Sequence, residues 1–117
     1  MIVRLEPQNF ELYAGNAKTL HFEIVDEDGA VVDITGATIA WGVSTHENSK
    51  SKLFSYTSPT NITITDAANG KFDVSVLASN TAALKAGDYH HQAEVTDAGG
   101  NPTTVAFGTI ELRTNIH

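Results

Sequence analysis

The 117-residue sequence contains no cysteine. Disulfide bonds are therefore excluded, and so are metal and redox sites that depend on thiolates. Proline is scarce, with three residues, and no segment is of low complexity, so the composition is that of a folded chain. At this length we expect one domain, residues 1–117, with a hydrophobic core of its own.

Long apolar runs and basic clusters are missing as well. No stretch approaches the roughly 18 apolar residues that a membrane-spanning helix needs. Residues 1–6 lack a basic region followed by an apolar run, so no secretory signal is predicted and synthesis in a cytoplasm is expected. Seven basic residues stand against 14 acidic ones, for a net charge of −7. Since nucleic-acid binding requires clustered Lys and Arg, we expect no contact with DNA or RNA.

The sequence does contain many segments in which apolar residues alternate with polar ones. Turn-forming Asp, Asn and Gly residues separate them, at residues 26–29, 66–70 and 97–101. This pattern is typical of half-buried antiparallel strands. It predicts an all-β fold, an antiparallel two-sheet immunoglobulin-like β-sandwich of seven or eight strands. The expected strands cover residues 19–26, 30–33, 39–43, 53–57, 62–64, 72–76, 89–95 and 103–112.

Two local features refine this expectation. A short helical turn near residues 80–85 is predicted as a connection between strands, with Ser79 as its N-cap and Gly87 just past its end. The buried face of the last strand changes parity between residues 107 and 110, which requires one extra residue. Gly108 is the expected bulge.

The alternation also predicts the core. Tyr89, at the start of a late strand, is interpreted either as a tyrosine corner, whose hydroxyl bonds upstream backbone, or as an ordinary core aromatic. The side chains expected inside are Phe22, Ile24, Ile39, Trp41, Phe72, Val74, Tyr89 and Val95. The polar loop 44–52 and the N-terminal segment 2–13 lack strand periodicity, so we expect them to contact a neighbouring molecule.

Histidines and acidic turns are the candidates for a metal site. His90 and His91 are adjacent in a strand, so they point to opposite faces and cannot share an ion; His91 is expected to be packed and hydrogen-bonded. A site built with His21 or His46 stays open, as ligands so far apart in sequence decide nothing before folding. Residues 26–29 resemble the start of a calcium loop, but Ala37 stands where an EF-hand needs Glu, so a turn is favoured.

Catalytic constellations are absent from the sequence pattern. Residues 44–47 read Ser-Thr-His-Glu, but neighbours along a strand or loop do not form a triad, and no nucleophile elbow exists. We therefore assign no catalytic, cofactor-binding or metal-binding residue and expect no enzyme activity.

Several motifs resemble small immunoglobulin-like structural proteins of tailed bacteriophages and prophages. The most distinctive is Asp-Ile-Thr-Gly-Ala-Thr at residues 33–38. The matching segments are residues 20–29, 32–41, 64–70, 81–89, 94–101 and 106–110. The chain is similar in particular to the N-terminal domain of phage baseplate upper proteins. The resemblance implies a structural virion role and brings no catalytic motif. In those proteins a coiled-coil stalk follows, whereas this sequence stops at His117, so a free-standing domain is expected.

The expected function is thus that of a non-enzymatic virion protein of the tail, baseplate or head–tail region, acting through protein–protein contacts. Its partners would be other phage structural proteins and copies of itself, with a trimer or hexamer favoured over a dimer. It would reside in the host cytoplasm during assembly and then in the virion. The alternative is a carbohydrate- or surface-binding module, which would need exposed aromatic side chains such as Tyr13, Trp41 or Tyr56 as a platform.

Overall fold

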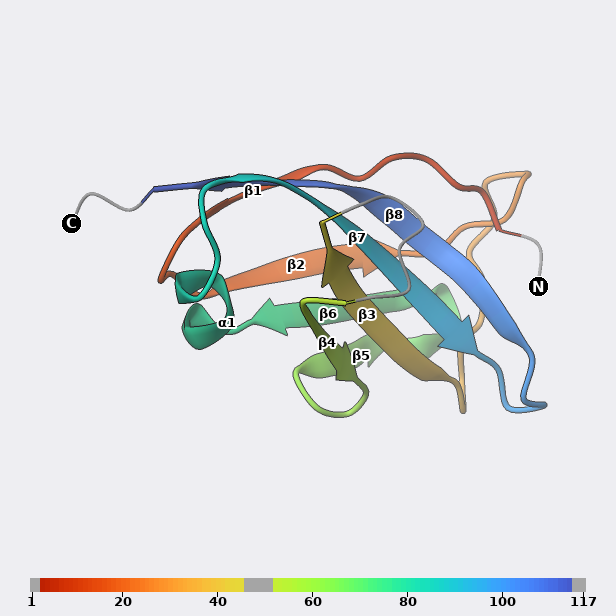
Figure 1. Ribbon diagram of the computed structural model, residues 1–117. Coiled ribbons are helices and arrows are strands. Elements are labelled where there is room, and N and C mark those ends of the chain that lie inside the picture. The colour runs from red at the N-terminus through yellow and green to blue at the C-terminus, as the bar shows by residue number, and fades with distance from the viewer. Residues whose placement is uncertain (1–2, 46–51, 115–117) are drawn as a thin grey trace.

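The computed structural model describes residues 3–45 and 52–114, which form two packed β-sheets (Figure 1). The five-stranded sheet has the order β1-β8-β7-β3-β4, and the three-stranded sheet, behind β3 and β4 in Figure 1, has the order β2-β6-β5. The predicted all-β sandwich is confirmed. The elements are β1 (Phe10–Tyr13), β2 (Lys18–Glu23), β3 (Thr38–Ser44), β4 (Phe54–Thr57), β5 (Ile62–Asp66), the 3-10 turn η1 (Ala67–Asn69), β6 (Lys71–Val76), α1 (Ala78–Ala82), β7 (Gly87–Thr96) and β8 (Pro102–Arg113).

The N-terminal segment contains a strand that the sequence pattern does not predict. β1 pairs in parallel with β8, whereas all other strand pairs in the two sheets are antiparallel. Upstream of it, Pro7 forms an isolated bridge with Phe107. Although residues 2–13 lack strand periodicity, Phe10–Tyr13 form a strand. Four residues are too few for a periodic signal, and the strand depends on pairing with a segment about a hundred residues away.

The strand expected at residues 30–33 is absent. The turn before it is present, because the Asp26 N–H donates to the Ala30 carbonyl at 2.8 Å. Only Val25 and Val31 then pair, as an isolated bridge. The Ile34 N–H donates instead to the Ala67 carbonyl at 2.9 Å. The chain therefore runs across to η1 rather than back along β2.

Helix α1 begins two residues before the predicted start, and Ser79 is not its cap. Leu77 occupies the N-cap position and makes no side-chain capping bond. The helix is fixed by Thr81, which is 1% exposed. Its hydroxyl accepts the Gly15 N–H at 3.0 Å and lies 3.1 Å from the Asn16 carbonyl oxygen. A tertiary contact, rather than a local capping signal, thus places this helix.

The predicted bulge in β8 exists, but at Val105 and not at Gly108. Ala93 pairs with Ala106 and Glu94 pairs with Thr104, which leaves Val105 as the extra residue. Gly108 pairs regularly with His91. A Cβ at Gly108 would overlap the backbone carbonyl of Gln8, so glycine is needed here to let the N-terminal segment approach the sheet.

The core lies between the sheets and matches the prediction except at Tyr89. Phe22, Ile24, Ile39, Trp41, Phe72, Val74 and Val95 are all buried. Tyr89 is half-buried and packs against the core. Its hydroxyl donates to the Lys85 carbonyl at 2.6 Å. This geometry confirms the tyrosine corner.

Replacing Trp41 by Ala should reduce the free energy of unfolding by about 3–5 kcal/mol, the usual cost of deleting a large buried aromatic side chain. Trp41 is 1% exposed and stacks on Tyr56 with ring centroids 5.9 Å apart. Urea denaturation followed by circular dichroism measures the effect. A loss below about 1 kcal/mol would contradict the buried position.

Gly108→Ala should destabilise the fold by about 1–3 kcal/mol, the range for overpacking a close contact. Gly99→Ala is the matched control. There the added Cβ would meet only side-chain atoms, of Asn101 and Asp97, at 3.3 Å. Thermal denaturation of both variants measures the difference. Equal melting temperatures would mean that Gln8 does not lie over Gly108.

Candidate functional site

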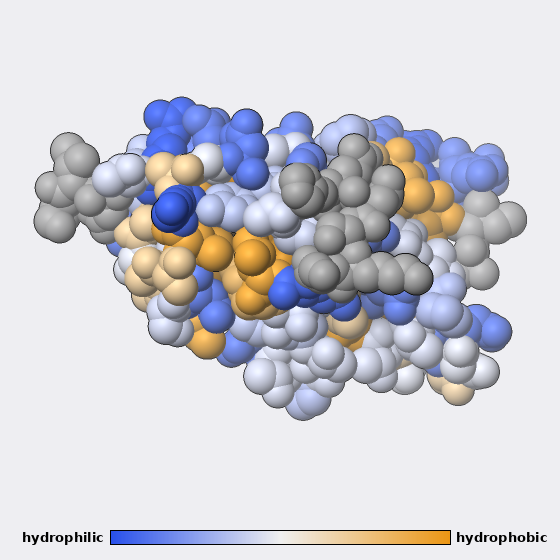
Figure 2. Space-filling view, in the orientation of Figure 1, coloured by the Kyte–Doolittle hydropathy of each residue, from blue (hydrophilic) through white to orange (hydrophobic). Residues whose placement is uncertain are grey.

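The outer face of the five-stranded sheet is hollowed into a concavity of about 810 Å³. β3, β7 and β8 form its floor, and the N-terminal segment forms one wall through Leu5, Pro7 and Asn9. Lys52 lies at its border. On the side of the molecule shown in Figure 2, hydrophobic atoms form small separate groups on a largely hydrophilic surface.

Small side chains on β3 explain why the face is concave. Ala40 and Gly42 stand where larger residues would fill the middle of the sheet, and the aliphatic part of Lys52 lies over Gly42. Beside them, Phe107 is half-buried, and the Gln92 amide donates to the Thr104 hydroxyl at 3.0 Å. The floor therefore combines a small apolar centre with neutral hydrogen-bonding groups and with two charged side chains, Glu94 and Lys52.

The structure does not bring the histidines together. His21 lies on the outer face of the three-stranded sheet, with its Nδ1 2.7 Å from the Asp73 carboxylate. His90 borders the concavity, whereas His91 is buried, as predicted. His46 and His117 lie outside the described residues. Within residues 3–45 and 52–114, no three His, Asp or Glu side chains are grouped as metal ligands would be.

The acidic turns use their carboxylates to hold the backbone. Asp26 Oδ1 accepts the N–H groups of Asp28 and Ala30 at 2.9 and 3.0 Å. Asp97 Oδ1 does the same for Gly99 and Asn101, and the bonds from Asn101 lower the pKa of this carboxyl below its usual value. The interpretation of both segments as turns is confirmed.

Of the Ser-Thr-His-Glu run at residues 44–47, Ser44 ends β3 and is 8% exposed. Residues 46 and 47 lie outside the described residues.

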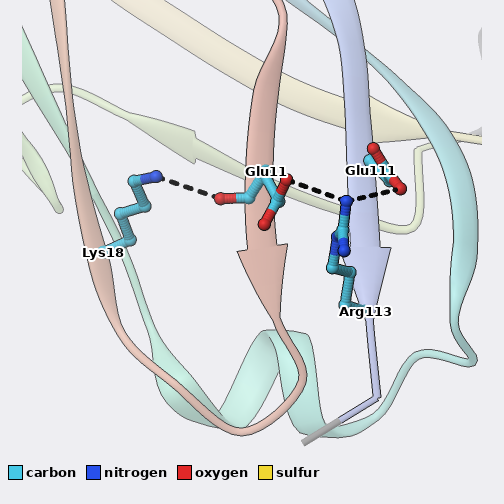
Figure 3. A network of polar contacts seen from close by, with 4 residues as sticks. All are labelled: Glu11, Lys18, Glu111 and Arg113. Carbon is cyan, nitrogen blue, oxygen red and sulfur yellow. Dashed lines mark hydrogen bonds and ion pairs between the residues drawn. The ribbon is translucent and has the colours of Figure 1, made fainter.

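A second polar cluster, drawn in Figure 3, ties the first strand to its neighbours. Arg113 Nη2 lies 3.1 Å from the Glu11 carboxylate and 3.3 Å from that of Glu111. On the other side, Lys18 donates to the Glu11 backbone carbonyl at 3.0 Å. The network links β2, β1 and β8. Because the charged side chains are about half exposed, each ion pair contributes only about 0–1 kcal/mol.

His91 joins three elements inside the core. Its Nδ1 accepts the indole N–H of Trp41 at 3.2 Å, and its Nε2 lies 2.6 Å from the carbonyl oxygen of Gln8. Nε2 must therefore carry the proton, because a carbonyl can only accept, and the ring is neutral. Burial lowers the pKa of His91, an effect that the bond to Gln8 partly offsets.

The arrangement of these residues defines the class of the fold as an immunoglobulin-like β-sandwich. In that class a tryptophan on the third main strand packs against a disulfide between two strands of opposite sheets, and a tyrosine corner precedes the second cysteine by two residues. Here Tyr89 precedes His91 by two residues, and Trp41 bonds to it. The ring of Phe22, on β2, lies 6.1 Å from the His91 ring. Phe22 and His91 thus occupy the place of the disulfide.

Comparisons with known proteins add little to this description. No protein-family model matches the chain, and no curated protein matches it either. Among solved structures, one of murine CRIg matches at 13% sequence identity and a TM-score of 0.44, over 93% of each chain. Among the described residues, no helix is long and apolar enough to cross a membrane.

The stability of the protein should fall as the pH drops below about 6.5, the ordinary pKa of histidine. Folding lowers the pKa of His91, so the unfolded chain binds a proton at this residue before the folded chain does. The loss is at most about 1.4 kcal/mol per pH unit for one proton. Thermal denaturation across this range measures it.

His91→Gln should flatten the pH dependence, because a glutamine amide can accept from Trp41 and donate to Gln8 without titrating. His90→Gln is the matched control, since His90 lies next in sequence on the opposite face. If the stability of His91→Gln fell with pH as steeply as that of the wild type, the pH dependence would come from other groups.

Proposed function

We propose that the chain is a non-enzymatic structural protein of a phage or prophage virion, of the tail, baseplate or head–tail region. It acts through protein–protein contact at the concave outer face of the five-stranded sheet. The observation that carries the proposal is the hollow at Ala40, which is lined by Phe107, by neutral amide and hydroxyl groups, and by the charged side chains of Glu94 and Lys52. Such a surface offers another protein an apolar centre, hydrogen-bonding groups and one charge of each sign.

The two sheets differ in a way that favours this face. On the outer face of the three-stranded sheet, His21 pairs with Asp73 and Glu23 lies 3.7 Å from Lys71, so its charges are already matched within the chain. The hollow face has Glu94 and Lys52 in its lining. A partner with complementary charges can therefore gain electrostatic interactions at the hollow face.

Edge strands support self-assembly as part of the same proposal. β4 and β5 each end a sheet, so one side of each has backbone groups that no strand of the described chain pairs. Such edges favour pairing with another chain. We infer a homo-oligomer, a trimer or hexamer, together with other phage structural proteins as partners. The protein would occur in the host cytoplasm during assembly and in the virion afterwards. Light scattering tests the oligomer, and a strict monomer at high concentration would contradict it.

The resemblance of the segments within residues 20–110 to phage immunoglobulin-like proteins is the reason for proposing a virion as the site of action.

The alternative of a carbohydrate-binding module would require exposed aromatic side chains on which a sugar could stack. Trp41 is 1% exposed and Tyr56 is 6% exposed, so neither can stack on a sugar. Tyr13 is 44% exposed but lies on β1, beside the ion-pair network.

Ala40→Arg should reduce incorporation of the protein into particles of its source phage by about tenfold or more, which corresponds to about 1.4 kcal/mol of lost binding. The long charged side chain would fill the hollow. Ser75→Arg is the matched control, because Ser75 is exposed on β6, the central strand of the other sheet. Mass spectrometry of purified particles, from a deletion strain complemented with each variant, measures incorporation.

Two outcomes would contradict the proposal. Absence of the wild-type protein from purified particles would exclude the virion role. Equal incorporation of the two variants, with unchanged melting temperatures, would exclude the hollow face as the contact.

A further inference from the structure

The N-terminal segment, residues 3–14, is attached to the sheet through a titratable side chain. Gln8 donates its N–H to the Phe107 carbonyl at 2.8 Å, and its own carbonyl oxygen lies 2.6 Å from His91 Nε2. The Gln8 backbone rests directly on Gly108. The imidazole thus bonds the segment at Gln8, beside Gly108.

This attachment requires a neutral ring. His91 Nδ1 accepts from the Trp41 N–H, so a second proton on the ring would place two N–H groups opposite each other. The residue is 3% exposed. An imidazolium here would also be buried among rings, at centroid distances of 5.3 Å from Phe10 and 6.1 Å from Phe22. Burying an uncompensated charge in such surroundings is costly.

The elements packed against His91 offer no acid to balance a positive charge. β1, β2 and β3 present Phe10, Phe22 and Trp41, and β8 presents Gly108. Among the described residues, the one charge that acts on His91 is that of His90, and it opposes protonation. The free-energy cost of a protonated His91 therefore falls only when the ring comes into contact with water.

We propose that His91 is a proton-operated latch for the N-terminal segment. The neutral ring holds residues 7–14 of this segment on the edge of β8, and the protonated ring displaces them. Pro7 and Asn9, on either side of Gln8, line the concavity, so moving this segment outward would open a route from the ring to water. The remaining sandwich keeps its own pairing, because β8 still pairs with β7 along ten residues of that strand. Release leaves one edge of β8 unpaired.

Amide hydrogen exchange on the whole protein tests the latch. The reporters are the Gln8 amide and the Ala14 amide, which donates to the Arg113 carbonyl at 2.9 Å. Between about pH 7.5 and about pH 5, on either side of the ordinary histidine pKa, their protection factors should fall by about tenfold or more. Amides of β6 should keep theirs over the same range. Protection factors remove the intrinsic pH dependence of exchange.

Variants separate the latch from general acid destabilisation. In His91→Gln the protection of residues 3–14 should not change with pH. His90→Gln should keep the loss of protection and shift it to a somewhat higher pH, because the charge of His90 no longer opposes protonation of His91. Gly108→Ala should release the segment at about pH 7.5, by pushing Gln8 away, and leave β6 protected. The proposal is wrong if the wild-type segment stays protected in acid, if β6 loses protection in parallel with it, or if His91→Gln shows the same loss. Should His91→Gln fail to fold, the imidazole nitrogen shifts of the wild type replace it. Titration of His91 must then coincide with the loss of protection, and a mismatch overturns the latch.

Discussion

A single chain of hydrogen bonds runs along the inner side of the five-stranded sheet, from the Trp41 indole through the His91 imidazole to the Gln8 carbonyl. It joins β3, β7 and the N-terminal segment, whereas the contact of His91 with the opposite sheet is the packing of its ring against Phe22. No buried side-chain polar atom among the described residues lacks a partner. Since a half-satisfied buried network is worse than an apolar one, each of the three groups depends on the other two. The two hydrogen bonds of the ring fix its tautomer.

The alternation of apolar residues predicts most of the sandwich because its strands bury one face each. The failures occur where long-range contacts decide the structure. β1 forms through its pairing with β8. α1 is positioned by the contacts of Thr81 with residues 15 and 16. The bulge of β8 lies at Val105. The sequence shows that the buried face of β8 changes parity, but it does not show at which residue. The bulge is predicted at Gly108 because glycine is the residue that fits there. Glycine is required at this position because the Gln8 backbone lies against it, and not because an extra residue is inserted.

The hollow face illustrates why surfaces are harder to predict than cores. Ala40 and Gly42 mark it in the sequence only as two small residues flanking a buried tryptophan. Their meaning depends on which strands lie beside β3 and on the wall that residues 5–9 build. The positions of the histidines, by contrast, can be predicted in part from the sequence. Strand parity separates His90 from His91, but no sequence pattern indicates that Trp41 and Gln8 would be the partners of His91.

The parallel pairing of β1 with β8 has a consequence for how the protein folds during synthesis. Phe10–Tyr13 emerges from the ribosome early, but its pairing partner, Ile110–Arg113, is made about a hundred residues later. Until then Leu12, which is 3% exposed in the folded protein, has no strand to pack beside. Contacts that close so long a loop form late and slow the search for the native state. The antiparallel pairs among β2 to β7 can assemble first, and the two ends of the described chain close the sheet as a final step.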